Sequence, residues 1–307
     1  MGTDAWAKGI QSTAIGTSSV APGTNLVALG VFANAGFQNG TSLGANSVAW
    51  DFAMATGFNA RALGTGATAI GHKALANAAS ATSVGYDAVA SRLAASVFGH
   101  HAVASGLEAS AFGTGASASG LRSNAFGVDS RATGVVSSAF GRAAEATGSQ
   151  STAIGNNATA STANTSAPGV LSFASGTNAT AIDHEASASN QNASALGRLS
   201  RASGQQSKAV GERAYANNIN ASTFGELSQA TGEQSVALGK EANASNTNSL
   251  AGGAYSVASG LFSVGVGRTQ QRRRTGPRRW AHFPPQRVSF CLRLVRNRLH
   301  RGSVLTA

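Results

Sequence analysis

The sequence predicts an all-β chain whose residues 1–267 wind into a parallel β-solenoid, or β-roll, with 14-residue coils. Glycine recurs every fourteen residues, a second column of mainly Gly or Asn follows seven residues later, and small and apolar residues alternate between the two. A helical fold is disfavoured, because the same sequence would place a glycine in the helix about every seven residues. Each such glycine would destabilise the helix by roughly 1 kcal/mol relative to alanine. Two short strands and two turns per fourteen residues therefore describe one coil of a solenoid.

An anchor glycine marks the first turn of each coil. The spacing is fourteen except for one step of thirteen, from Gly44 to Gly57, and Asp183 is the one interruption of the column. Glycine readily adopts positive φ, so each anchor predicts a tight turn. The anchors are Gly2, Gly16, Gly30, Gly44, Gly57, Gly71, Gly85, Gly99, Gly113, Gly127, Gly141, Gly155, Gly169, Gly197, Gly211, Gly225, Gly239, Gly253 and Gly267.

A second column of turn residues lies seven positions after the anchors. Glycine and asparagine tolerate positive φ better than other residues, so this column predicts a second turn of the same kind. From the middle of the chain onward it reads Gly106, Gly120, Gly134, Gly148, Thr162, Gly176, Asn190, Gly204, Asn218, Gly232, Asn246 and Gly260.

The first strand of each coil follows its anchor. The third residue after the anchor is Ala or Ser and the fifth is always Ala, as in Ala158 and Ala160. This period of two predicts that both side chains face the interior of the coil. The residue between them is charged in several coils, for example Arg131 and Glu145, so it should face water.

The second strand reads Ser-x-Ala-Φ-Gly, where Φ is large and apolar, and is apolar on both faces. One face can line the coil, and the other needs a second cover. We expect the large residue to point inward and the adjacent alanine to pack against a neighbouring chain. Identical positions stack in a solenoid, so the sequence also predicts an aromatic ladder of Phe98, Phe112, Phe126 and Phe140.

A fourteen-residue coil buries little apolar area, and burial stabilises the fold by only ~25 cal/mol for each Å² of that area. Ordering each residue costs ~1–2 kcal/mol of conformational entropy, which opposes folding. The thin core and the two-faced strand together predict obligate oligomerisation. Residues 1–267 hold 12 basic and 12 acidic residues and are formally neutral, so they impose no long-range repulsion between copies of the chain.

The net charge of +11 resides in residues 268–307, which contain eleven arginines and no acidic residue. We expect this Arg-rich tail to be unstructured, and interpret it as a frameshifted reading of GC-rich DNA. The alternative is a genuine basic arm that binds nucleic acid through counterion release or binds an anionic membrane. One cysteine excludes a disulfide framework, and no apolar run reaches the length of a transmembrane helix.

No motif in the chain predicts catalysis, a cofactor, a metal or a small-molecule substrate. The Gly-x-Gly runs, such as Gly64-Thr-Gly66, lack a βαβ context, and no nucleophile elbow is present. The body histidines His72, His100, His101 and His184 are expected to be solvated turn residues. An ice-binding or scaffold solenoid remains an alternative, because Thr13, Thr41, Thr68, Thr82, Thr152 and Thr180 recur in one column. Val27, Asn124, Lys208 and Val236 interrupt that column.

The repeats resemble the head domains of YadA-like trimeric autotransporter adhesins over residues 1–267. Three segments carry the motif most clearly: Ser12-Thr-Ala-Ile-Gly16, Ser151-Thr-Ala-Ile-Gly155 and Ser235-Val-Ala-Leu-Gly239. The resemblance implies a left-handed roll, a homotrimer, display on the outer membrane of a Gram-negative bacterium and a role in virulence. It also implies attachment to host matrix such as collagen or fibronectin, to host cells or to other bacteria, without nucleic-acid specificity.

The resemblance carries a set of candidate matrix-binding positions over to this chain. These are Ser12, Ala14, Ile15, Ser151, Ala153, Ile154, Ser235, Val236, Ala237 and Leu238. Beyond Gly267 the expected neck sequence does not follow, and we recognise no signal peptide, coiled-coil stalk or membrane anchor.

Overall fold

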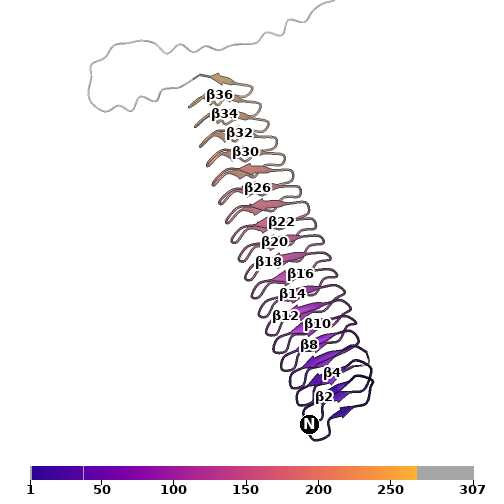
Figure 1. Cartoon of the computed structure of the whole chain (residues 1–307). Helices are drawn as coiled ribbons and strands as arrows, with labels where there is room; N and C mark the ends of the chain where they lie inside the picture. Colours follow the sequence, from indigo (N-terminus) through magenta and orange to yellow (C-terminus); the bar gives the residue numbers. More distant parts are fainter. Residues whose placement is uncertain (1, 37, 268–307) are drawn as a thin grey trace, which may run out of the picture. The chain divides into compact units, whose positions relative to one another are not determined.

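The structure, a computed structural model, describes residues 2–36 and 38–267. These residues form a single stack of coils, which succeed one another in sequence order from the N-terminus (Figure 1). The expectations for the Arg-rich tail, residues 268–307, fall outside the described residues. Within the described part, no helix is long and apolar enough to cross a membrane.

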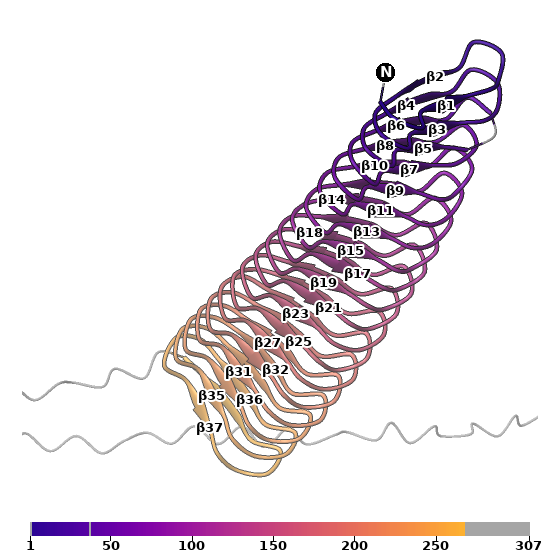
Figure 2. The same cartoon turned by 90° about the horizontal axis from the view of Figure 1, so that it is seen from below.

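Each coil contributes one strand to each of two parallel sheets of 19 strands (Figure 2). The odd-numbered strands have two residues and form the first sheet. They are β1 (Trp6–Ala7), β3 (Val20–Ala21), β5 (Asn34–Ala35), β7 (Val48–Ala49), β9 (Arg61–Ala62), β11 (Leu75–Ala76), β13 (Val89–Ala90), β15 (Val103–Ala104), β17 (Ser117–Ala118), β19 (Arg131–Ala132), β21 (Glu145–Ala146), β23 (Thr159–Ala160), β25 (Phe173–Ala174), β27 (Ser187–Ala188), β29 (Arg201–Ala202), β31 (Tyr215–Ala216), β33 (Gln229–Ala230), β35 (Asn243–Ala244) and β37 (Val257–Ala258).

The even-numbered strands have three residues and form the second sheet. They are β2 (Thr13–Ile15), β4 (Val27–Leu29), β6 (Thr41–Leu43), β8 (Met54–Thr56), β10 (Thr68–Ile70), β12 (Thr82–Val84), β14 (Ser96–Phe98), β16 (Ser110–Phe112), β18 (Asn124–Phe126), β20 (Ser138–Phe140), β22 (Thr152–Ile154), β24 (Ser166–Pro168), β26 (Thr180–Ile182), β28 (Ser194–Leu196), β30 (Lys208–Val210), β32 (Ser222–Phe224), β34 (Val236–Leu238), β36 (Leu250–Gly252) and β38 (Val264–Val266).

Like positions of successive coils pair with one another, as the fourteen-residue period predicts. Phe112 pairs with Phe98 on one side and with Phe126 on the other. The one step of thirteen keeps this register, because Ser42 pairs with Ala55. The missing residue is taken from the turn between β7 and β8, so neither sheet is interrupted.

The anchor glycines form the first turn, as expected. Gly141 has a φ of 131°, its N–H donates to the Phe126 carbonyl at 2.8 Å, and its carbonyl accepts the Ala144 N–H at 3.3 Å. A Cβ on Gly141 would lie 2.6 Å from the Gly155 carbonyl oxygen. Both the backbone conformation and the next coil therefore select glycine at this position.

The second column corrects our expectation, because its glycines do not adopt positive φ. The positive φ falls two residues later, for example at Arg122 (54°) and Gln150 (57°). Glycine is selected instead by close approach: a Cβ on Gly120 would overlap the carbonyl oxygen of Gly134 in the next coil. Where Asn218 replaces glycine, its Nδ2 donates to the Thr231 carbonyl of the next coil at 3.3 Å.

Four small side chains per coil fill the interior. In one coil these are Ala144, Ala146, Ser151 and Ala153, all with no exposed surface. The third and fifth residues after each anchor thus face inward, as predicted. Buried serines are satisfied locally, since the Ser151 Oγ donates to the Gly148 carbonyl at 2.7 Å.

The orientation that we expected for the second strand is wrong. Ala153 points into the coil, whereas the large residue before the anchor, Ile154, faces outward and is 45% exposed. The physical reason is the narrow space between the two sheets of the coil. The space between the two sheets is filled by alanine and serine side chains, and a large side chain in every coil would not fit there.

Candidate interaction surface

The outer face of the second sheet carries an apolar ladder. We define it as the residue before each anchor position, which lies at the end of every even-numbered strand. Most rungs are large, apolar and half-buried or exposed, and Thr56, Pro168 and Gly252 are the exceptions. The ladder consists of Ile15, Leu29, Leu43, Thr56, Ile70, Val84, Phe98, Phe112, Phe126, Phe140, Ile154, Pro168, Ile182, Leu196, Val210, Phe224, Leu238, Gly252 and Val266.

The middle of the apolar ladder is the predicted aromatic stack. The ring centroids of Phe98 and Phe112 lie 4.7 Å apart, those of Phe112 and Phe126 lie 4.7 Å apart, and those of Phe126 and Phe140 lie 5.2 Å apart. These spacings follow from the separation of neighbouring parallel strands. The stack lies on the outside of the coil, and Phe98 and Phe140 remain 41% and 39% exposed.

A second aromatic column lies on the other side of the anchor turn. His72 stacks between Phe58 and Tyr86, at centroid distances of 5.4 and 4.8 Å, and Tyr86 stacks on His100 at 5.0 Å. The Nδ1 atom of His72 is buried and has no hydrogen-bond partner. The expectation of solvated histidines therefore holds for the exposed His100 and His101, but not for the half-buried His72 and His184, whose Nδ1 atoms are both buried.

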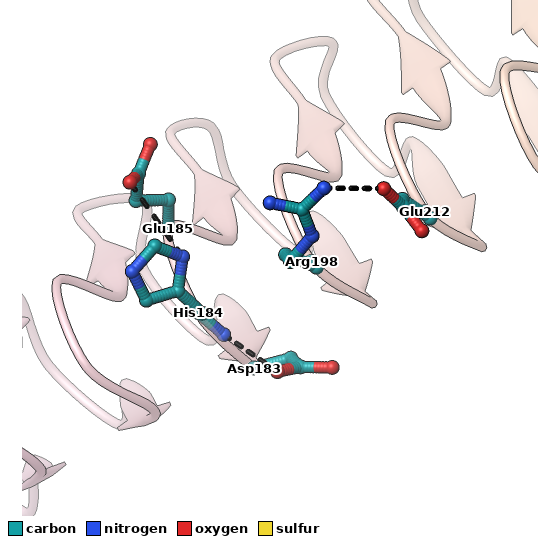
Figure 3. A network of polar contacts seen from close by, with 5 residues as sticks. All are labelled: Asp183, His184, Glu185, Arg198 and Glu212. Carbon is teal, nitrogen blue, oxygen red and sulfur yellow. Dashed lines mark hydrogen bonds and ion pairs between the residues drawn. The ribbon is translucent and has the colours of Figure 1, made fainter.

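Charged side chains further along the stack occupy the same turn, as predicted for a solvated corner. The Arg198 Nη2 lies 2.6 Å from the Glu212 Oε1 one coil away (Figure 3). In the same figure the Asp183 Oδ1 accepts the His184 N–H at 2.7 Å, and the His184 Nδ1 lies 3.5 Å from the Glu185 Oε1. The described residues contain no group of three side chains able to hold a metal ion.

The candidate matrix-binding positions divide into inward and outward residues. Ala14, Ser151, Ala153, Ser235 and Ala237 are buried. The hydroxyls of Ser12, Ser151 and Ser235 each donate to the carbonyl three residues earlier, at 2.8, 2.7 and 2.6 Å.

The outward residues of these strands are the ones that a partner can reach. Ile15, Ile154 and Leu238 are exposed rungs of the apolar ladder, and Val236 is half-buried beside it. The three strands lie far apart in the stack, in β2, β22 and β34, so the structure gathers their residues into a column rather than a pocket. Ligand binding at these positions stays a prediction.

The outer face of the first sheet is more polar and carries shallow recesses. One of them spans three successive coils, with Leu171 and Phe173 on the first, Glu185 on the second, and Leu199 and Arg201 on the third. Sequence reasoning did not identify this recess, because no residue in it departs from the repeat pattern.

A single coil geometry repeated along two parallel sheets, with large apolar side chains in surface columns, defines a repeat protein that presents an extended surface. The family model of the YadA head domain repeat matches residues 1–19, 7–33, 51–74, 104–130, 132–158, 146–169, 174–200, 188–214 and 230–256. These matches cover more than half of the chain, and the protein belongs to this family.

The comparison with solved structures includes the crystal structure of the collagen-binding domain of the Yersinia adhesin YadA. It is 18% identical, the match covers 71% of this chain and 76% of that chain, and the TM-score is 0.21. A superposition this poor carries no argument, and the family assignment rests on the repeats. No curated protein matches the chain.

Proposed function

We propose that this chain is the head of a homotrimeric surface adhesin that attaches a bacterium to host matrix, host cells or other bacteria. The observation that carries the proposal is the apolar ladder, which runs the length of the stack and is left uncovered by the chain's own fold. Monomeric proteins rarely expose contiguous apolar surface on this scale, and such surfaces mark interfaces. Family membership supports the same function.

In the proposed trimer, the apolar ladders of three chains pack together and provide the second cover that the two-faced strand needs. The remaining outer columns stay open, and repeated coils present similar contacts at regular intervals. Weak contacts to a repetitive partner such as collagen then add up through avidity. Fibronectin is a second expected matrix partner.

The first test is the molar mass of the full chain, measured by light scattering on a sizing column. We expect the mass of a trimer. The double variant Phe112→Glu with Phe126→Glu would bury charge in the interface, so it should no longer reach the mass of a trimer, and its circular dichroism should lose β signal because folding is coupled to assembly. The matched control is Val103→Glu with Ser117→Glu, which places the same charges on the outer face of the first sheet.

A folded monomer of the unmodified chain would contradict the proposal and would favour an isolated solenoid of the ice-binding or scaffold type. For the trimer, we expect binding to immobilised collagen that changes little between low and high salt. Salt-sensitive binding that disappears on deletion of residues 268–307 would favour the basic arm as the binding element instead.

A further inference from the structure

The chain contains seven Asn-x-Ser/Thr triplets in which x is not proline. This triplet is the acceptor sequence for N-linked sugars, and it has meaning only where the asparagine lies on an accessible turn. The seven asparagines are Asn39, Asn157, Asn164, Asn178, Asn192, Asn220 and Asn243.

Five of the seven triplets occupy one structural position, the turn that enters an even-numbered strand. They begin at Asn39, Asn164, Asn178, Asn192 and Asn220, whose φ values lie between 48° and 58°. The middle residue is buried in every case, and the hydroxyl residue opens the strand on its outer side. The fold therefore places the asparagine and the hydroxyl of each triplet on the same outer surface.

Asn220 differs from Asn164 and Asn178 of this column in having an amide that donates to no described residue. It is exposed, and its side chain makes no hydrogen bond to the described residues. Its backbone is held firmly: its N–H donates to the Gln205 carbonyl at 2.9 Å, and the Ala221 N–H closes the turn on the Asn218 carbonyl at 3.1 Å. The Asn220 amide is thus presented from a fixed turn.

Three neighbouring asparagines instead form a ladder of side-chain hydrogen bonds. The Asn164 Nδ2 donates to the Asn178 Oδ1 at 3.1 Å, and the Asn178 Nδ2 donates to the Asn192 Oδ1 at 3.1 Å. The Nδ2 atoms of Asn164 and Asn178 are therefore engaged. Asn192 ends the ladder, and its Nδ2 donates to no described residue.

We propose that Asn220, and secondarily Asn192, is an acceptor site for N-linked glycosylation of the folded roll. The co-substrate is a sugar whose anomeric carbon is bonded to a nucleoside diphosphate. The Asn220 Nδ2 forms a bond to the anomeric carbon, the bond from that carbon to the phosphate oxygen breaks, and the nucleoside diphosphate leaves. The proton lost from Nδ2 passes to a base of the transferase.

The site is compatible with the proposed trimer and does not depend on it. Asn220 precedes the first residue of β32, Ser222, whereas the apolar-ladder residue Phe224 lies at the other end of that strand. A sugar on Asn220 would therefore extend from the corner opposite to the ladder. Failure of trimer formation would leave this proposal standing, and the reverse also holds.

To test the proposal, the folded full chain is incubated with UDP-glucose and a soluble N-glycosyltransferase that recognises Asn-x-Ser/Thr. Sites are then located by peptide mass spectrometry. We expect one added hexose at Asn220 and a lower occupancy at Asn192. Asn164 and Asn178 should have several-fold lower occupancy in the folded chain, and should reach that of Asn220 when the chain is first unfolded in urea and diluted.

Two controls separate recognition from mere exposure. Ser222→Ala should abolish the hexose at Asn220 and leave Asn192 unchanged. Asn248 has the same turn conformation, with a φ of 55°, but Leu250 in place of the hydroxyl residue, so it should stay unmodified. An unmodified Asn220 in the folded chain would overturn the proposal, provided that a synthetic peptide of residues 216–226 is modified by the same enzyme. Equal occupancy at Asn164 and Asn220 in the folded chain would overturn the protective role of the ladder.

Discussion

At the scale of single residues, turns decide which side chains the repeat tolerates. The anchor glycines combine a positive φ with a backbone neighbour in the next coil. The exception, Asp183, has a φ of 98° and compensates in part by accepting the His184 N–H. Asparagine and aspartate tolerate positive φ because their short polar side chains can bond locally.

Gly141→Ala should destabilise the roll by at least about 2 kcal/mol. Its φ is strained for any residue with a Cβ, and the added atom would meet the Gly155 carbonyl. The free energy of unfolding from urea titration measures the effect. Gly260→Ala is the matched control, because its nearest new neighbour is the Ser263 Cβ at 3.4 Å, and it should change stability by less than about 1 kcal/mol. Equal losses for the two variants would contradict this account.

Arginine and lysine side chains on the surface pair with carboxylates one coil away, as Arg122 does with Glu108 and Arg198 with Glu212. The Lys240 Nζ lies 3.0 Å from the Glu226 Oε2, and hydrogen bonding and attraction to that carboxylate raise the pKa of Lys240 above its usual value. A raised lysine pKa contributes stability at neutral pH that is lost only as the pH rises through that pKa. Exposed pairs of this kind contribute little to the free energy of unfolding.

At the scale of the strand and the coil, the width of the interior controls which residue faces inward. Every inward column is dominated by Ala and Ser, and Leu26 and Val97 are the largest fully buried apolar side chains in the described part. The large apolar residues are displaced to the outside, where they stack one coil apart. A one-residue deletion is tolerated at a turn because the strands on either side keep their pairing.

Ala153→Leu should cost about 3 kcal/mol or more, since the inserted atoms can be accommodated only by separating the two sheets. Ala163→Leu is the matched control, because the corresponding turn position already carries Leu107 and Leu121 in other coils. We expect the control to change the unfolding free energy by no more than about 0.5 kcal/mol. Urea titrations of both variants provide the measurement, and a tolerated leucine at position 153 would show that the interior can widen.

At the scale of the whole molecule, the stack is a one-dimensional array in which each coil contacts only its neighbours. Such an array gains stability from interfaces between repeats, and here each interface buries only small side chains. The apolar ladder is the main apolar surface that the fold of a single chain leaves unburied. Its burial between chains is the physical basis for expecting that folding and assembly are coupled.

This coupling predicts a concentration-dependent thermal midpoint. Association of folded chains stabilises the folded state by mass action, because only folded chains bind one another. The thermal midpoint of a trimer should therefore rise by about 2–4 °C for each tenfold rise in protein concentration. Differential scanning calorimetry over two decades of concentration measures this shift. A midpoint independent of concentration, in a reversible transition, would indicate that the single chain is stable without its partners.

The sequence by itself determined the period, the two strands of each coil, the inward alanine column and the aromatic stack, because a repeat must satisfy the same backbone geometry in every coil. The family resemblance followed from the same residues. Only the tertiary structure decided which face of Ser-x-Ala-Φ-Gly points inward, since both faces are apolar and only the distance between the sheets excludes the larger residue.

The tertiary structure also decided the role of the second glycine column and the state of the sequon asparagines. Gly120 is required by the carbonyl of the next coil, a contact that no local pattern reveals. Asn178 and Asn220 look alike in sequence, but one amide donates to its neighbour and the other is free. In both cases the deciding contact involves a residue of the neighbouring coil. The sequence gives the spacing of that residue but does not show whether the contact forms.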